Sequence, residues 1–159
     1  MIKTKLQKAH LLLFSKEINS KRLMHYSFNI KIMHKYFFLL LRLIVAAILI
    51  QTLRFKFTAH PDSVYIFQTV GLEPYGRIVI GVLELIAGIL LLIPKTIWLG
   101  ATLTIGVIGS AIFMHLTKLG IEINNDSGIL FTTAVVTFII SVIILYMSRN
   151  KIPLINNKP

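Results

Sequence analysis

Residues 76–94, GRIVIGVLELIAGILLLIP, form an apolar run that carries one charge near its middle, Glu84. A helix of about 17–25 residues crosses the roughly 30 Å hydrocarbon core of a bilayer, and this run has that length. A charged side chain at the bilayer centre costs about 2.5–3.5 kcal/mol on insertion scales, so such residues usually face other helices and pair with them. The run therefore predicts a membrane helix whose carboxylate contacts a polar group inside a bundle.

Three further runs have a similar length, and the composition of the whole chain agrees with them. The 159 residues are 55% hydrophobic and only 14% charged, which is typical of membrane proteins. The four spans are expected at about residues 36–53, 77–93, 97–116 and 128–147. The runs are continuous and do not alternate as the strands of a membrane barrel do. The sequence predicts an all-α protein: an integral membrane four-helix bundle over residues 36–150, with a cytoplasmic tail at 151–159.

Proline, glycine and asparagine separate these spans. Pro94 ends the second run, and the short link that follows makes the second and third spans an antiparallel hairpin. In the longest connection, residues 54–76, Asp62 or Ser63 can cap a short helix that ends at Gly71. We expect this extra helix at the outer, extracytoplasmic face of the bundle; an ordinary interfacial turn is the alternative.

The Lys and Arg residues are distributed unequally between the two sides of the predicted bundle. Twelve lie on the side that holds both termini, four lie on the other side, and Arg42 lies within the first span. Because cytoplasmic segments carry the excess of basic residues, we expect both termini in the cytoplasm of a multi-pass protein of the bacterial inner membrane. The formal net charge of +11 alone would suggest nucleic-acid binding. Since these basic residues flank membrane spans, we expect membrane lipid and no nucleic acid as a partner.

Residues 1–35 differ from the rest of the chain, because they combine eight basic residues with only short apolar stretches. Two interpretations stay open for this basic N-terminal extension. It can form an interfacial amphipathic helix whose basic side chains face lipid headgroups. Alternatively, Met33 begins MHKYFFLLLRL, a natural start for a four-span protein, and part of residues 1–32 is then an over-called translation start.

Arg42 and Glu84 are the full charges that the predicted spans place deep in the membrane. The first two spans are antiparallel neighbours, and a helical rise of about 1.5 Å per residue puts the two side chains within reach of each other. We therefore expect an ion pair between Arg42 and Glu84. Because desolvation can exceed the attraction within a buried pair, a proton path or a polar ligand site at these residues is the competing interpretation. Snorkelling toward the lipid headgroups is a third.

A second polar group, which we call the outer rim, is expected at the outer end of the bundle. Its members are the basic residues and histidines near that end: Arg54, Lys56, His60, Arg77, His115 and Lys118. A bis-histidine haem needs two ligands on facing helices, and His115 is the only histidine inside a predicted span, so no haem is expected. The chain has no cysteine, which excludes disulfides, and no His, Asp or Glu cluster has metal-ligand spacing.

Small residues recur at four-residue spacing on the last two spans. The two stripes are Thr102, Gly106 and Ser110 on the third span, and Thr133, Thr137 and Ser141 on the fourth. Gly81 and Gly88 lie on the helix of Glu84. Membrane helices use such residues for close packing, so we expect packing seams.

Several stretches together resemble the DoxX-like family of four-helix bacterial membrane proteins. They are Arg42 in the first span, KF at 56–57, EPYGR at 73–77, GVLELIAGILLLIP at 81–94 and AIFMHLTKLGI at 111–121. The resemblance covers about residues 36–150 and leaves residues 1–32 without a counterpart. It implies an inner-membrane bundle with a redox association, either as a membrane subunit of quinone-linked thiosulfate oxidation or as a membrane partner of a soluble oxidoreductase. The polar positions of interest that it implies are Arg42, Lys56, Arg77, Glu84 and His115.

The leading hypothesis is a membrane component of a quinone-linked redox system, with the quinone head group near Arg42 and Glu84 or at the outer rim. A quinone carbonyl needs a hydrogen-bond donor beside an apolar slot. The sequence shows no electron-carrying centre, so any catalysis would need a bound cofactor or a partner. The alternative is a non-catalytic assembly partner or a small-molecule or lipid-binding membrane protein. A homo-oligomer is compatible with either hypothesis.

Overall fold

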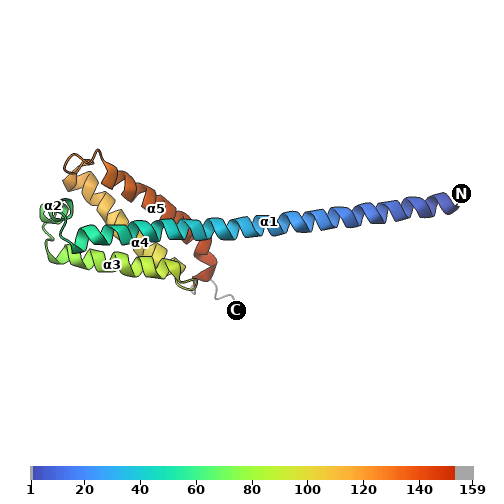
Figure 1. The fold of residues 1–159 in the computed structure, drawn as a ribbon, viewed down its shortest axis with the longest axis horizontal. Coiled ribbons are helices and arrows are strands. Elements are labelled where there is room, and N and C mark those ends of the chain that lie inside the picture. The colour runs from blue at the N-terminus through green and yellow to red at the C-terminus, as the bar shows by residue number, and fades with distance from the viewer. Residues whose placement is uncertain (1, 153–159) are drawn as a thin grey trace. The chain divides into compact units, whose positions relative to one another are not determined.

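The structure is a computed structural model that describes the backbone of residues 2–152 and the side chains of residues 16, 19, 22, 24, 26 and 28–152. The described part is helical and contains no strand. Its α-helices are α1 (Ile2–Phe57), α2 (Pro61–Thr69), α3 (Tyr75–Leu92), α4 (Ile97–Met114) and α5 (Ile129–Ser148) (Figure 1). A π-helical turn, η1 (His115–Leu119), follows α4, and a 3-10 turn, η2 (Arg149–Lys151), follows α5.

Four helical segments of the described part are long and apolar enough to cross a membrane. They are Phe28–Phe57, Tyr75–Leu92, Ile97–Leu119 and Ile129–Lys151. These segments agree with the four predicted spans and confirm the predicted all-α, four-helix membrane architecture. The first predicted span lies within α1, which continues through residues 35 and 36 without a break.

The chain divides into two compact units, Met1–Leu39 and Leu40–Pro159. In the first unit the backbone of residues 2–39 belongs to α1. Residues 2–35 of the predicted extension are thus helical. An interfacial location for it and a translation start at Met33 both stay predictions. The predicted tail at 151–159 lies outside the described residues from residue 153 onward.

The second unit is an antiparallel bundle with two different ends. At one end the link of residues 93–96 joins α3 to α4, and Lys151 Nζ after α5 donates a hydrogen bond to the Pro94 carbonyl at 3.0 Å. We call this the link end. At the other end the loop between α4 and α5 lies beside α2 (Figure 1), and Asn124 Nδ2 of this loop donates to Asp62 Oδ1 at 2.8 Å. We call this the loop end.

Glycines allow the helices of the bundle to approach closely. A Cβ atom placed on Gly100 would lie 2.6 Å from the Leu91 nitrogen and 3.0 Å from the Ala87 carbonyl oxygen, so α3 and α4 meet backbone to backbone there. Gly81 and Gly88 are buried on the face of α3 that contacts α1. This confirms the packing role predicted for these two residues.

The two predicted stripes of small residues have different outcomes. On α5, Thr137 and Ser141 are buried, as predicted, whereas Thr133 is half-buried. On α4, Thr102, Gly106 and Ser110 are exposed on the surface of the bundle. The prediction of a packing seam on this face is wrong for the bundle itself, because α4 turns the face that lies two residues earlier in the sequence toward its neighbours.

The predicted short helix is present as α2, which excludes an ordinary turn. The helix begins after His60, whose Nδ1 accepts a hydrogen bond from the Asp62 backbone N–H at 3.4 Å. The cap is therefore His60 and not Asp62 or Ser63 as predicted. Pro61 occupies the first turn, where a missing N–H is tolerated. Ser63 and Phe67 are buried and attach α2 to the loop end.

Candidate intramembrane polar site

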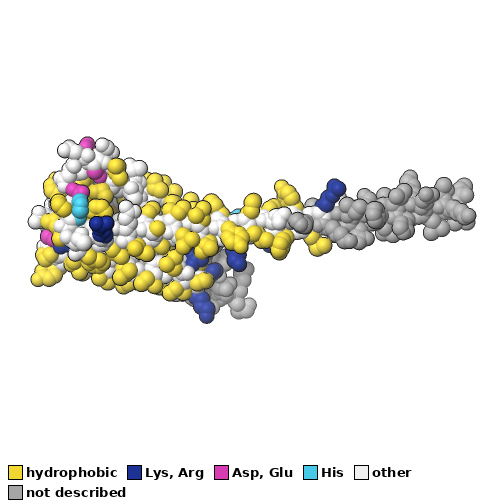
Figure 2. Space-filling view, viewed as in Figure 1, with side chains coloured by type: hydrophobic (Ala, Val, Ile, Leu, Met, Phe, Trp, Pro, Cys, Tyr) yellow, Lys and Arg dark blue, Asp and Glu magenta, His cyan; other side chains and the backbone are white. Residues whose placement is uncertain are grey.

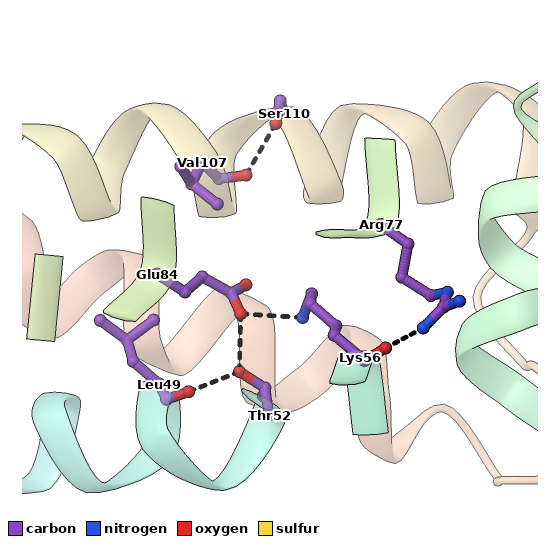
Figure 3. A network of polar contacts seen from close by, with 7 residues as sticks. All are labelled: Leu49, Thr52, Lys56, Arg77, Glu84, Val107 and Ser110. Carbon is purple, nitrogen blue, oxygen red and sulfur yellow. Dashed lines mark hydrogen bonds and ion pairs between the residues drawn. The ribbon is translucent and has the colours of Figure 1, made fainter. Parts of the chain in front are cut away.

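Glu84 lies inside the bundle and contacts two polar side chains of α1. Its Oε2 is 2.9 Å from Lys56 Nζ and accepts a hydrogen bond from Thr52 Oγ1 at 2.8 Å (Figure 3). The side chain of Lys56 is 13% exposed and that of Glu84 is 4% exposed, so the ion pair is almost completely removed from solvent. We call Thr52, Lys56 and Glu84 the polar site.

The direction of helical side chains explains why these residues meet. The Cα–Cβ bond of a helical residue tilts toward the N-terminus of its helix. Lys56, near the C-terminal end of α1, therefore tilts from the loop end toward the middle of the bundle. Glu84, on the antiparallel α3, tilts toward the loop end. The two side chains converge, and Thr52 joins them because it lies one turn before Lys56 on the same face of α1.

Arg42 does not pair with Glu84 as predicted. Its Nε donates to the Leu91 carbonyl at 2.6 Å and its Nη2 donates to the Leu92 carbonyl at 2.7 Å. Arg42 thus binds the C-terminal end of α3, whose last carbonyls lack partners within the helix. The tilt of the side chains accounts for the error: Arg42 tilts toward the link end and Glu84 toward the loop end, so the two diverge. A role of either residue in ligand binding stays a prediction.

Arg77 fixes the backbone that carries Lys56. Its guanidinium contacts the Glu73 carboxylate with Nη2 at 2.8 Å from Oε1 and with Nε at 2.9 Å from both oxygens. Its Nη1 donates to the carbonyl of Lys56 (Figure 3). Arg77 is buried, so it holds the end of α1 against the start of α3 and is not an open surface charge as the predicted outer rim would have it.

The other members of the predicted outer rim lie in different environments. Arg54 and Lys118 are exposed at the loop end. His60 caps α2, lies 3.5 Å from Asp62 Oδ2 through its Nδ1 and meets the Phe55 ring edge-on at a centroid distance of 4.6 Å. With Lys56 turned inward and Arg77 paired, the structure does not bring the six residues together as one basic rim.

His115 begins the π-helical turn and is buried. Its Nδ1 lies 2.7 Å from the Gly120 carbonyl oxygen, and its ring meets Phe131 of α5 edge-on at 5.6 Å. These contacts stabilise the turn that follows α4, where Gly120 adopts a positive φ of 80°. His115 therefore positions the α4–α5 loop. Among the described contacts, His115 does not touch Glu84.

Asp126 organises the same loop through its carboxylate. Oδ1 accepts from the backbone N–H groups of Ile123 and Gly128, both at 2.9 Å, and Oδ2 accepts from Leu130 N–H at 3.0 Å. Desolvation by burial favours the neutral acid, but these three donors, together with the nearby His115, outweigh it and lower the pKa of Asp126. Asp126 is thus a charged cap for the start of α5.

The polar site combines an ammonium donor, a carboxylate acceptor and a hydroxyl that can act as either, in surroundings that are otherwise apolar. This set suits the carbonyl or hydroxyl groups of an apolar ligand, and its carboxylate can exchange a proton. It does not resemble a metal site, which needs several ligands of the His, Asp or Glu type. Among the residues with described side chains, no three or more such residues gather in a way that could hold a metal ion.

From the sequence, Lys56 is predicted in the outer rim, and Thr52 is given no role in the site. A usable signal was present: Thr52 and Lys56 are four residues apart and share a helix face. A side chain at the C-terminal end of one helix and an acid on the antiparallel neighbour also tilt toward each other.

Comparisons with protein-family models, with curated proteins and with solved structures found no match to this chain. The resemblance to the DoxX-like family is therefore an expectation from the quoted residues alone.

Proposed function

We propose that this multi-pass membrane protein is the membrane component of a quinone-linked redox system and binds a quinone head group at Thr52, Lys56 and Glu84. The observation that carries the proposal is the Lys56–Glu84 ion pair, which is buried between helices long and apolar enough to span a membrane. Buried ion pairs are a weak source of stability, because an apolar contact of the same shape is often equally or more stable. An ion pair inside the membrane therefore indicates a candidate functional site.

The chemistry of the polar site fits a quinone in each of its redox states. The Lys56 ammonium and the Thr52 hydroxyl can donate to a quinone carbonyl, and the Glu84 carboxylate can accept from a quinol hydroxyl. When a quinone takes up two electrons it also takes up two protons; these would come from water, and the Glu84 carboxylate would relay each by taking up a proton before passing it on. The electrons would come from a soluble oxidoreductase, the partner that the DoxX-like resemblance suggests.

The same resemblance and the Lys and Arg distribution support the proposed location. We propose that the protein resides in a bacterial inner membrane with both termini in the cytoplasm. The link end of the bundle then faces the cytoplasm and the loop end faces outward. A fusion of a cytoplasm-active reporter at residue 159 tests this orientation, since the reporter should be active there and inactive when inserted after Asn125.

Binding of a short-chain quinone to the purified full chain in lipid nanodiscs tests the proposed site. We expect the quinone to raise the melting temperature of the wild type, and Glu84→Gln or Lys56→Met to remove that increase. Lys118→Gln is the matched control, because it changes an exposed charge outside the polar site.

Two other outcomes of this binding experiment would contradict the proposed site. Loss of quinone binding in Lys118→Gln with retention in Glu84→Gln would move the ligand to the exposed residues of the loop end. Absence of quinone stabilisation in the wild type would leave the Lys56–Glu84 pair as a structural contact of a non-catalytic assembly partner, which is the alternative that the sequence left open.

A further inference from the structure

We infer that the link end of the bundle is a binding surface for the phosphate headgroup of anionic phospholipids. Three basic side chains from two segments lie at this end. Lys95 comes from the α3–α4 link, and Arg149 and Lys151 follow α5. The hydrogen bond from Lys151 Nζ to the Pro94 carbonyl, 3.0 Å long, holds these segments together. All three side chains are exposed.

No acidic side chain of the described residues 40–152 lies at the link end to neutralise these charges. Asp62, Glu73, Glu122 and Asp126 belong to the connections at the loop end, and Glu84 is engaged by Lys56 inside the bundle. Figure 2 shows acidic side chains at the loop end of the bundle and none at the link end on this face, whereas Lys and Arg side chains lie at both ends. The link end therefore presents positive charge without an acidic partner among these residues.

One of the helix ends at this site, the N-terminus of α4, adds to this positive charge. The C-terminal carbonyls of α3, which carry the negative end of its dipole, accept hydrogen bonds from Arg42 at 2.6 and 2.7 Å. The N-terminus of α4 lies at the same end and has no side-chain cap, since the Thr96 hydroxyl donates backward to the Leu90 carbonyl at 3.1 Å. The negative end of α3 is thus neutralised by Arg42 and that of α5 lies beside Arg149, whereas the positive end of α4 has no side-chain cap and can accept an anion.

Aromatic residues place these charges at the depth of lipid headgroups. Trp98, the single tryptophan of the chain, lies in the first turn of α4, and Tyr146 lies in the last turn of α5. Tryptophan and tyrosine concentrate at membrane–water interfaces. The Arg149 guanidinium stacks on the Tyr146 ring at 4.0 Å from its centroid, which fixes the guanidinium beside an interfacial ring. A phosphate at this depth belongs to a lipid, because the apolar helices below it contact acyl chains.

Native mass spectrometry of the purified full chain tests this inference. The protein is titrated in detergent with phosphatidylglycerol or with phosphatidylcholine of identical acyl chains. We expect the wild type to bind phosphatidylglycerol more tightly. Each Lys or Arg near an anionic surface contributes about a fivefold preference, so the double variant Lys95→Gln/Arg149→Gln should reduce the preference at least tenfold. The charge-conserving variant Lys95→Arg/Arg149→Lys should retain most of it.

The matched control is Arg54→Gln/Lys118→Gln, which removes the same charge from exposed residues at the loop end. This control should keep the wild-type preference for phosphatidylglycerol within about twofold. The contribution of about fivefold per basic residue is expected only from charges near the bound headgroup. An equal loss in the control would show that only net charge matters and would overturn the inference, as would an unchanged preference in Lys95→Gln/Arg149→Gln. Displacement of the lipid by inorganic phosphate at equal concentration would also overturn it, because the surface would then recognise a free anion. None of these variants changes the polar site, so quinone binding can succeed or fail independently.

Discussion

Replacing Glu84 by glutamine should destabilise the bundle, because the change leaves the Lys56 ammonium without its counter-charge. Breaking one partner of a buried ion pair typically costs about 3–5 kcal/mol. Lys56 is 13% exposed and lies near the end of α1, so part of this loss is avoided when its flexible side chain turns toward water. We therefore expect a loss of about 2–3 kcal/mol in the free energy of unfolding.

The double variant Lys56→Met/Glu84→Leu separates the ion pair from simple packing. This variant lacks both charges. We therefore expect its free energy of unfolding to lie within about 1 kcal/mol of the wild-type value or to exceed it. Unfolding in mixed micelles with increasing detergent fraction measures Glu84→Gln as well as the wild type, Lys56→Met, Glu84→Leu and the double variant, and the last four together form a double-mutant cycle. Additive losses in the two single variants and the double variant would refute the reasoning, because additivity means that Lys56 and Glu84 do not interact.

Three other contacts give predictions of the same kind. Arg42→Leu should lower the free energy of unfolding by about 2–3 kcal/mol in the same unfolding assay, because two carbonyls at the end of α3 lose a charged donor, and Glu84→Gln should not change this loss. Gly100→Ala should destabilise by about 1–3 kcal/mol, since its Cβ would meet the backbone of α3, whereas Gly106→Ala, in open space in the interior of α4, should stabilise by about 0.5–1 kcal/mol through the higher helix propensity of alanine. Asp126→Asn should lose about 1–2 kcal/mol at neutral pH through its weaker cap. Because folding lowers the pKa of Asp126, this contribution should be full above its ordinary value of 3.8 and should disappear as the pH falls through the lower folded pKa, which a melting series against pH measures.

The architecture was predictable because each span is a continuous apolar run and each break contains proline, glycine or asparagine. Hydropathy alone places such a span to within a few residues, and all four predicted spans correspond to helices of the structure. The short helix α2 was also predictable from its turn residues. Its cap was not, because histidine is an uncommon cap and Asp62 is used instead to bind the loop at Asn124.

The partner of Glu84 was not predictable from hydropathy, since a shift of one helical turn between two antiparallel helices changes which side chains meet. Residue depth suggested Arg42, and only the direction of the side chains favours Lys56. The exposure of Thr102 shows a related limit. A stripe of small residues identifies a helix face, but the rotation of α4 in the bundle depends on Gly100, which fits closely against α3.

The central claim is that the Glu84 carboxylate, paired with Lys56, is the group that a quinone contacts. Infrared difference spectroscopy of the full chain in lipid nanodiscs, recorded on addition of a short-chain quinone, tests it most directly. The account predicts a quinone-induced shift of a carboxylate band in the wild type and in Lys118→Gln, and its absence in Glu84→Gln. A band that shifts equally in Glu84→Gln, or a quinone that binds while leaving the wild-type carboxylate bands unchanged, would contradict the account.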